Sequence, residues 1–205
     1  MLLPDGYSDL PAGKLAAIVT SLQMTSRPEP RSEQPRDGWS MQKVDRPNVD
    51  WYRDLYRRIG EDWLWFSRAS MPAESLTAII HSPDVEVYAF ASGGLTQGLV
   101  ELDYRTSGEC ELAFFGLTKD AVGSGAGRWM MNRAIEQAWA RPIRRFWVHT
   151  CTLDHQNALA FYVRSGFVPF RRQIEIADDP RLTGAFSRDA APHFPIIEPG
   201  SSQAP

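Results

Sequence analysis

The spacing of apolar and polar positions predicts helices and strands in alternation along the chain. Residues 11–24 place four aliphatic side chains on one helical face behind a proline at the first position, so we predict an N-terminal helix there. Residues 25–38 are mostly proline, arginine, glutamate and serine with almost nothing to bury, and this composition predicts a mobile connector. Beyond Asp178, a tail of proline, serine, alanine and glycine is expected to have no regular structure.

The middle of the chain predicts a sheet flanked by helices. Strands are predicted at residues 39–44, 85–91, 97–105, 109–117, 145–150 and 167–176. Helices are predicted at residues 51–59, at 61–80 with a break at Met71-Pro72, at 127–140, and around Tyr162, with Asp154 as the cap of this last helix and Gly166 as its end. The link Thr106-Ser107-Gly108 closes a hairpin, so its two strands are antiparallel. We therefore predict an α/β (α+β) fold with a mixed, mostly antiparallel sheet of about six or seven strands.

Composition and charge limit the classes of protein to consider. A chain of 205 residues with 43% hydrophobic content can bury one sizeable core, and we expect one domain. The formal net charge of −3 argues against a general nucleic-acid binder. No apolar run approaches the roughly 20 residues needed to cross a bilayer, and the N-terminus lacks a signal peptide, so we expect a cytoplasmic protein without a membrane partner. Cys110, Cys151 and four scattered histidines predict neither a disulfide framework nor a metal site.

The segment from Leu117 to Arg128 is the most distinctive in the chain. An apolar run ends in three alternating glycines, Gly123, Gly125 and Gly127, and passes directly into a helical pattern. Glycines let the backbone curl around an anion, and the free N–H groups of the first helical turn then point at it. This predicts a cradle for a pyrophosphate-bearing cofactor, although an ordinary strand-to-helix turn has the same pattern. The absence of a lysine after the glycines argues against ATP, and the G-x-G-x-G spacing among antiparallel strands argues against NAD.

Two motifs resemble those of the GNAT acetyltransferase superfamily. Val122-Gly-Ser-Gly125-Ala-Gly127 is similar to the acetyl-CoA loop of that family, Gln/Arg-x-x-Gly-x-Gly/Ala, with Val122 at the Gln/Arg position and Arg128 as a substitute cation. Downstream, Asn157 is followed by Tyr162 five positions later and then by Gly166-Phe167, as in the second family motif. The resemblance implies a GNAT-like fold and acetyl-CoA as the cofactor.

The same resemblance implies domain boundaries and a cofactor site. The acetyltransferase domain is expected at residues 38–177, between the N-terminal helix and linker at 1–37 and the irregular tail at 178–205. The expected cofactor-binding residues are Leu117, Thr118, Val122, Gly123, Ser124, Gly125, Ala126, Gly127, Arg128 and Asn157. A splay or bulge of the strand at residues 115–118 is expected to expose backbone N–H groups to the thioester and pantetheine. The Asn157 amide is expected to bind the cofactor, with a simple helix cap as the alternative.

Acetyl transfer to an amine requires a base, because an alkyl ammonium with a pKa of about 10.4 must first lose a proton. Strand alternation puts Glu109 and Glu111 on one face, and Glu111 is our first choice because it lies six residues before Leu117, where some GNAT lysine acetyltransferases carry their base. Glu101 and Asp103 share a face of the partner strand. An even-sum register would bring all four acids together into a negative pocket that suits a cationic amine, whereas an odd register would separate them.

Tyr162 is the expected acid, because a phenol with a pKa near 10 stays protonated at neutral pH and can donate a proton to the departing thiolate. The alternative is an aromatic residue in the core stripe of its helix. His149 and Cys151 share a strand face near the expected site, so His149 is a rival base and Cys151 a rival acetyl carrier. Packed core residues are the alternative for both.

The acceptor is expected to be a small-molecule amine, such as a polyamine or an aminated antibiotic, a lysine side chain, or a peptide N-terminus. The aromatic residues 62–68 are expected either to form a cation-stacking wall for it or to seat a helix in the core. The function predicted is an N-acetyltransferase that uses acetyl-CoA by direct transfer. The alternatives are a non-catalytic acyl-CoA-binding sensor and, disfavoured by the net charge, a toxin that acetylates charged tRNA. A homodimer is left open.

Overall fold

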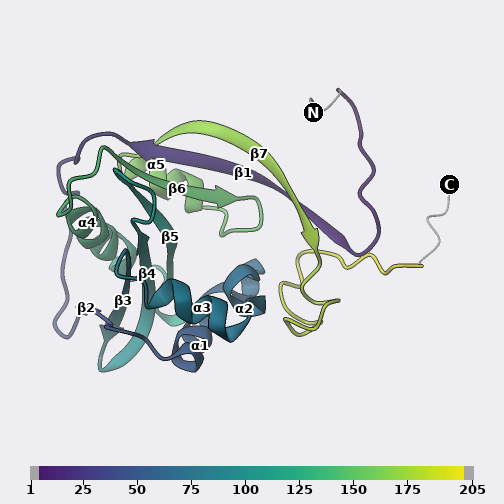
Figure 1. The fold of residues 1–205 in the computed structure, drawn as a ribbon, viewed down its shortest axis with the longest axis horizontal. Coiled ribbons are helices and arrows are strands. Elements are labelled where there is room, and N and C mark those ends of the chain that lie inside the picture. The colour runs from purple at the N-terminus through teal and green to yellow at the C-terminus, as the bar shows by residue number, and fades with distance from the viewer. Residues whose placement is uncertain (1–4, 201–205) are drawn as a thin grey trace.

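The computed structural model describes residues 5–200, which form a seven-stranded sheet in the order β2-β3-β4-β5-β6-β1-β7 (Figure 1). The strands are β1 (Lys14–Met24), β2 (Ser40–Lys43), β3 (Val85–Ser92), β4 (Leu95–Asp103), β5 (Glu109–Leu117), β6 (Arg145–Cys151) and β7 (Val168–Asp178). Neighbouring strands in these residues are antiparallel except β5 and β6, which are parallel. The predicted mixed, mostly antiparallel sheet is confirmed.

Helices cover both faces of the sheet. They are α1 (Val49–Gly60), α2 (Ser67–Ser70), α3 (Ala73–Ile80), α4 (Ala126–Ala138) and α5 (Ala158–Arg164), with short 3-10 turns η1 (Glu61–Trp63) and η2 (Lys119–Ala121). The break predicted at Met71-Pro72 is confirmed between α2 and α3. The helical segment predicted at residues 61–80 is also interrupted at Leu64, whose left-handed φ of 52° ends η1. No helix within residues 5–200 is long and apolar enough to span a bilayer.

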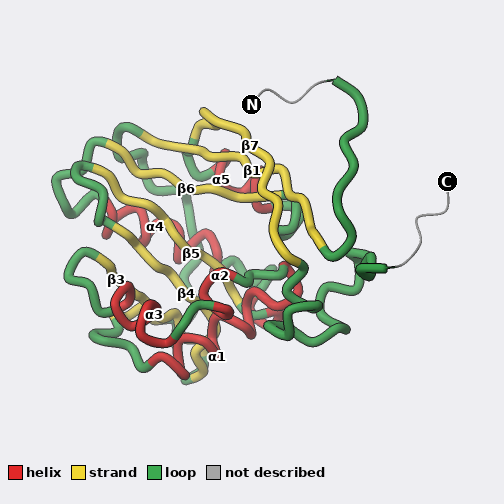
Figure 2. The backbone as a smooth tube through the Cα atoms, turned by 45° about the vertical axis from the view of Figure 1, so that its right-hand side comes forward, coloured by secondary structure: helices red, strands yellow, loops and turns green. Residues whose placement is uncertain are grey.

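The prediction of an N-terminal helix at residues 11–24 was wrong, because this segment is strand β1. It is hydrogen-bonded on both edges: Thr20 lies opposite Thr150 of β6 and opposite Arg172 of β7. Figure 2 shows β1 and β7 running side by side along one edge of the sheet. Helical spacing of the aliphatic residues is compatible with either structure, but the β-branched run of Ile18, Val19 and Thr20 favours a strand, and pairing on both edges satisfies its backbone groups.

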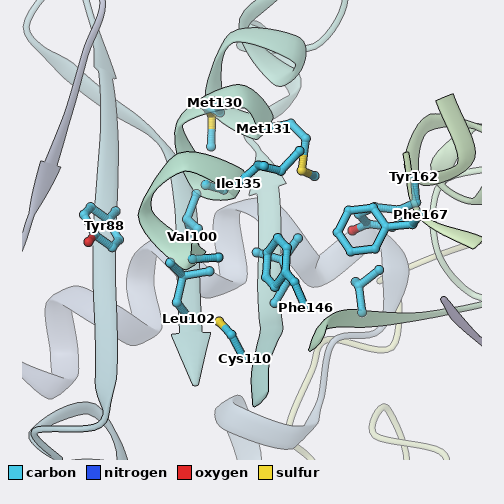
Figure 3. Close-up of a cluster of buried hydrophobic side chains, with 14 of the residues drawn as sticks. Tyr88, Val100, Leu102, Cys110, Met130, Met131, Ile135, Phe146, Tyr162 and Phe167 are labelled. Atoms are coloured by element: carbon cyan, nitrogen blue, oxygen red, sulfur yellow. The ribbon is translucent and has the colours of Figure 1, made fainter. Parts of the chain in front are cut away.

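Two hydrophobic clusters lie on opposite faces of the sheet. One packs α4 and α5 against the sheet through residues such as Met130, Phe146 and Phe167, and Figure 3 shows Tyr162 beside Phe167 in this cluster. The other packs α1–α3 against β3 and β4. The tail after Asp178 has no helix or strand up to residue 200, as predicted, but Phe186 belongs to this second cluster. The tail is therefore part of the packed fold.

A buried ion pair holds the start of the tail. Arg181 and Asp179 are 3% and 2% exposed, and Arg181 Nη2 lies 2.7 Å from Asp179 Oδ2. Arg181 Nη1 also donates to the carbonyl oxygens of Ala190, Ala191 and Phe194. These bonds tie two ends of an irregular loop to one guanidinium.

The capping role predicted for Asp154 was also wrong. Helix α5 begins four residues later, with Asn157 at the N-cap position and no side-chain capping bond. The Asp154 carboxylate instead accepts hydrogen bonds from Trp65 Nε1 (2.9 Å), Thr150 Oγ1 (2.7 Å) and the Cys151 backbone N–H (2.9 Å). The end of α5 at Gly166 is confirmed by its left-handed φ of 101°.

Candidate active site

A cavity of about 840 Å³ opens where β5 and β6 separate. The two strands pair only from Glu109 to Glu111, so the backbone of β5 after Glu111 has no partner on its β6 side. The register of β4 and β5 also shifts, leaving Ala113 as an extra residue between Leu112 and Phe114. The splay or bulge of this strand was predicted at residues 115–118. The bulge and the separation both begin earlier, and Leu117 lies on the cavity wall.

The glycine loop forms one end of the cavity. Gly125 is the N-cap of α4 with a left-handed φ of 93°, a conformation that favours glycine, and Gly123, Gly125 and Gly127 all line the wall. Among the described residues, the backbone N–H groups of these three glycines and of Arg128 donate to no acceptor. These free donors meet the requirement for an anion cradle.

The other residues predicted around the loop have different positions. Ser124 Oγ donates to Ala121 O (2.6 Å) and accepts from the N–H of Ala126 (3.2 Å), so these two residues shape the turn. Thr118 is buried outside the cavity wall, and its N–H donates to Gln97 O (2.8 Å). Val122 lies on the wall and is 54% exposed.

Three arginines line the cavity near the glycine loop: Arg31, Arg128 and Arg164. Of these three, only Arg128 was predicted from the sequence to bind the cofactor. Arg164 lies two positions after Tyr162, so its closeness in sequence to the expected acid could have identified it as a site residue. Arg31 had no comparable signal, because it lies in a polar connector whose position depends on contacts with α4.

Tyr162 belongs both to the core and to the cavity wall. It is 7% exposed, its ring contacts those of Phe161 and Phe167, and its hydroxyl has no hydrogen-bond partner in the described part of the chain. Burial, with a smaller contribution from Asp154, raises the pKa of Tyr162 well above its usual value. The phenol is therefore protonated at neutral pH. Asn157 lines the same cavity, and its side-chain amide makes no bond to the described residues.

The four acids of β4 and β5 do not converge into an unpaired negative pocket. The even-sum register holds where Asp103 faces Glu111, but the bulge places Glu101 opposite Phe114. Each acid also has its own cationic or hydrogen-bonding partner: Glu101 bonds to Arg68 and Tyr52, Asp103 to Arg105, Glu109 to Arg145 and Glu111 to His149. Glu101 is fully buried away from the cavity.

Glu111 and His149, the two rival bases, form a pair on the cavity wall. His149 Nδ1 lies 3.2 Å from Glu111 Oε1, and Nε2 has no partner among the described residues. The hydrogen bond to Glu111 raises the pKa of His149 above its usual value, and burial opposes this only in part. The imidazole is therefore a stronger proton acceptor than a free histidine.

Cys151 also lines the cavity, but its chemistry is unfavourable for an acetyl carrier. Burial raises the pKa of the Cys151 thiol to about 11. The thiolate is the reactive form, so this thiol is a weak nucleophile at neutral pH.

Aromatic side chains also line the cavity. Trp63, Trp65 and Phe66 line the cavity, so the predicted aromatic segment does border it. They do not form the face of one helix, because the chain turns at Leu64. Trp65 is held by its bond to Asp154, and the Trp63 ring packs against His155 with centroids 5.2 Å apart.

The sequence from residue 40 to residue 167 matches the acetyltransferase (GNAT) family. The chain belongs to this family. The comparison with curated proteins found no match to this chain.

Solved structures share the fold of this GNAT protein at low sequence identity. A functionally unknown conserved protein from Staphylococcus epidermidis is 18% identical, with a TM-score of 0.59, over 82% of this chain and 63% of that one. A GCN5-related N-acetyltransferase from Sphaerobacter thermophilus is 15% identical, with a TM-score of 0.58, over 80% of this chain and 52% of that one. An aminoglycoside acetyltransferase from an uncultured soil metagenomic sample is 12% identical, with a TM-score of 0.51, over 63% of this chain and 88% of that one. The GNAT chain thus spans 63% and 52% of the first two structures.

Proposed function

We propose that this GNAT protein transfers an acetyl group from acetyl-CoA directly to a primary amine. The observation that carries the proposal is that one cavity is bordered by the free N–H groups of the glycine loop, the unbonded hydroxyl of Tyr162 and the Glu111–His149 pair. Its volume of about 840 Å³ lies in the range of cofactor sites.

The residues of the loop fit a pyrophosphate. The N–H groups of Gly123, Gly125, Gly127 and Arg128 would donate to its oxygens, and the positive end of the α4 dipole adds to their attraction. The Asn157 amide and the β5 backbone at Leu117 would bind the pantetheine portion. Ser124, Ala126 and Thr118 would support the loop rather than contact the cofactor.

Acetyl-CoA would supply the thioester, and the side chains would move two protons. His149 Nε2 accepts a proton from the acceptor ammonium while Glu111 holds Nδ1. The freed amine nitrogen attacks the thioester carbonyl, so a C–N bond forms as the C–S bond breaks. Tyr162 donates its hydroxyl proton to the departing sulfur, and the proton lost from the nitrogen after attack restores the phenol.

The acceptor is a primary amine, either on a small molecule or as a lysine side chain or peptide N-terminus. Trp63, Trp65 and Phe66 offer flat faces on which a cation or an alkyl chain can pack. Asp103, Glu111 and Asp154 on the cavity wall are already paired, whereas Glu175 on the same wall has no hydrogen bond or ion pair among the described residues. Selection of the amine therefore rests on this carboxylate, on the aromatic wall and on deprotonation by the base.

The test combines calorimetry with release of free thiol over a panel of amines and peptides. Replacing Tyr162 by phenylalanine removes only the hydroxyl, which has no partner within the described structure, so binding of acetyl-CoA is expected to persist while turnover falls by about 100-fold or more. Wild-type turnover in Tyr162→Phe would contradict the role of the phenol.

A non-catalytic acyl-CoA-binding sensor is the second candidate. It is favoured by Val122, an exposed aliphatic residue where the family motif has glutamine or arginine. Acetyl-CoA binding without thiol release across the whole panel would support this candidate over the enzyme.

A further inference from the structure

The N-terminal connector crosses the sheet on the side that carries α4. Strand β1 lies between β6 and β7, whereas β2 lies at the opposite edge of the sheet. The chain between them must therefore cross the width of the sheet, and Figure 1 shows it running past α4. We call residues 25–38 the strap.

Specific contacts tie the strap to α4. The Asn132 side chain accepts from the backbone N–H of Arg31 (3.2 Å) and donates to its carbonyl oxygen (2.8 Å). Arg128 Nη1 donates to Ser32 O (2.9 Å), and Glu33 forms an ion pair with Arg133. These bonds hold the backbone of Arg31 in place, and its side chain lines the cavity.

The arginines at this end differ from those elsewhere on the wall. Arg68 and Arg105 are paired with Glu101 and Asp103, respectively. Arg31, Arg128 and Arg164 have no carboxylate partner in the described structure.

Arg31 also lies close enough to Arg128 and to Arg164 to be repelled by both. Burial and then the charges of Arg128 and Arg164 lower the pKa of Arg31. Unpaired positive charge is therefore concentrated at one rim of the cavity, where an anion would relieve the repulsion.

We propose that Arg31, Arg128 and Arg164 bind the 3′-phosphate of coenzyme A, and that the strap supplies Arg31 to this site. The inference rests on the proposed function. The N–H groups of the glycine loop already account for the pyrophosphate, whereas the ribose phosphomonoester carries close to two further charges and matches a cluster of guanidinium groups. The protein would thereby select coenzyme A over its dephosphorylated form.

The experiment measures Kd by calorimetry for acetyl-CoA and for 3′-dephospho-acetyl-CoA. Wild-type protein is expected to bind the dephosphorylated ligand at least about tenfold more weakly, since each charge-assisted bond contributes that much or more. Arg31→Gln and Arg164→Gln should each weaken acetyl-CoA binding by about tenfold and leave the Kd of the dephosphorylated ligand unchanged. Arg36→Gln is the matched control, because Arg36 lies on the same strap, outside the cavity wall, near the Trp39 ring.

The outcomes separate this inference from the proposed function. Equal affinity of the wild type for both ligands would overturn the phosphate site while leaving the acetyl-CoA site intact. Loss of affinity for both ligands in Arg31→Gln, with unchanged thermal unfolding, would also overturn it, because the residue would then not act through the 3′-phosphate. Failure of the wild type to bind either ligand would reject the proposed function itself.

Discussion

At the scale of single residues, the Glu111–His149 pair is the feature that the sequence left unresolved. Both residues were candidates for the base. Strand alternation assigns side chains to the faces of one strand but does not identify the neighbouring strand, so it could not predict that the two side chains meet. The parallel register that sets Glu111 opposite Trp147 brings His149, two residues further on, within 3.2 Å of it. The two rivals are therefore partners.

This pair predicts the pH dependence of turnover. A base must be neutral to accept a proton, so kcat/KM should fall as the pH drops through the pKa of His149. Glu111→Gln removes the interaction that raises this pKa and should shift the acidic limb to lower pH. The charge-dependent part of the pair's stability is present at low pH and is lost as the pH rises through the raised pKa.

The measurement is a rate profile from about pH 5 to pH 9, with an NMR titration of His149 in both proteins. His149→Gln serves as the control, since removal of the imidazole should abolish the acidic limb of the rate profile. An acidic limb that stays at the same pH in Glu111→Gln would show that another group titrates.

At the scale of elements, the glycine loop joins a strand to a helix through a backbone that few residues adopt. Gly125→Ala places a Cβ at a φ of 93°, which should cost about 1–2 kcal/mol of folding stability and weaken acetyl-CoA binding. Gly94→Ala is the control, because Gly94 has a φ of 80°, has open space around it and lies outside the cavity wall. Chemical denaturation and calorimetry compare the two. Equal acetyl-CoA affinity in both variants would contradict the cradle.

Most elements follow from local pattern, and the exceptions share one cause. The hairpin, the helix at 126–138 and the end of α5 at Gly166 are fixed by turn residues and periodicity near to them in the chain. Strand β1 is fixed by distant partners, since its aliphatic spacing is also that of a helix face. The role of Asp154 likewise depends on Trp65, which is far away in the sequence. Local pattern carries no information about such neighbours.

At the scale of the whole molecule, the tail contributes a buried ion pair that composition did not reveal. Asp179→Ala leaves Arg181 charged and uncompensated in a buried position, so we expect a loss of about 3–5 kcal/mol in the free energy of unfolding. The neighbouring Asp178 pairs with Lys14 at the surface, with 65% of its side chain exposed. Asp178→Ala should therefore cost no more than about 1 kcal/mol.

Urea denaturation of the two variants tests this contrast. A smaller loss in Asp179→Ala than in Asp178→Ala would mean that the tail does not depend on the pair. This pair could not be predicted from local pattern, because an aspartate and an arginine two positions apart in an irregular segment are typical of surface residues.

The position of β1 has a consequence for how the protein is made. The ribosome synthesises this strand before the other strands of the sheet, whereas β6 and β7, which must flank it, are the last two strands of the sheet to be produced. The nascent chain therefore carries β1 without its two neighbouring strands until β6 and β7 have been synthesised. Completion of the sheet waits for these two strands, and until then both open edges of β1 can pair with other chains.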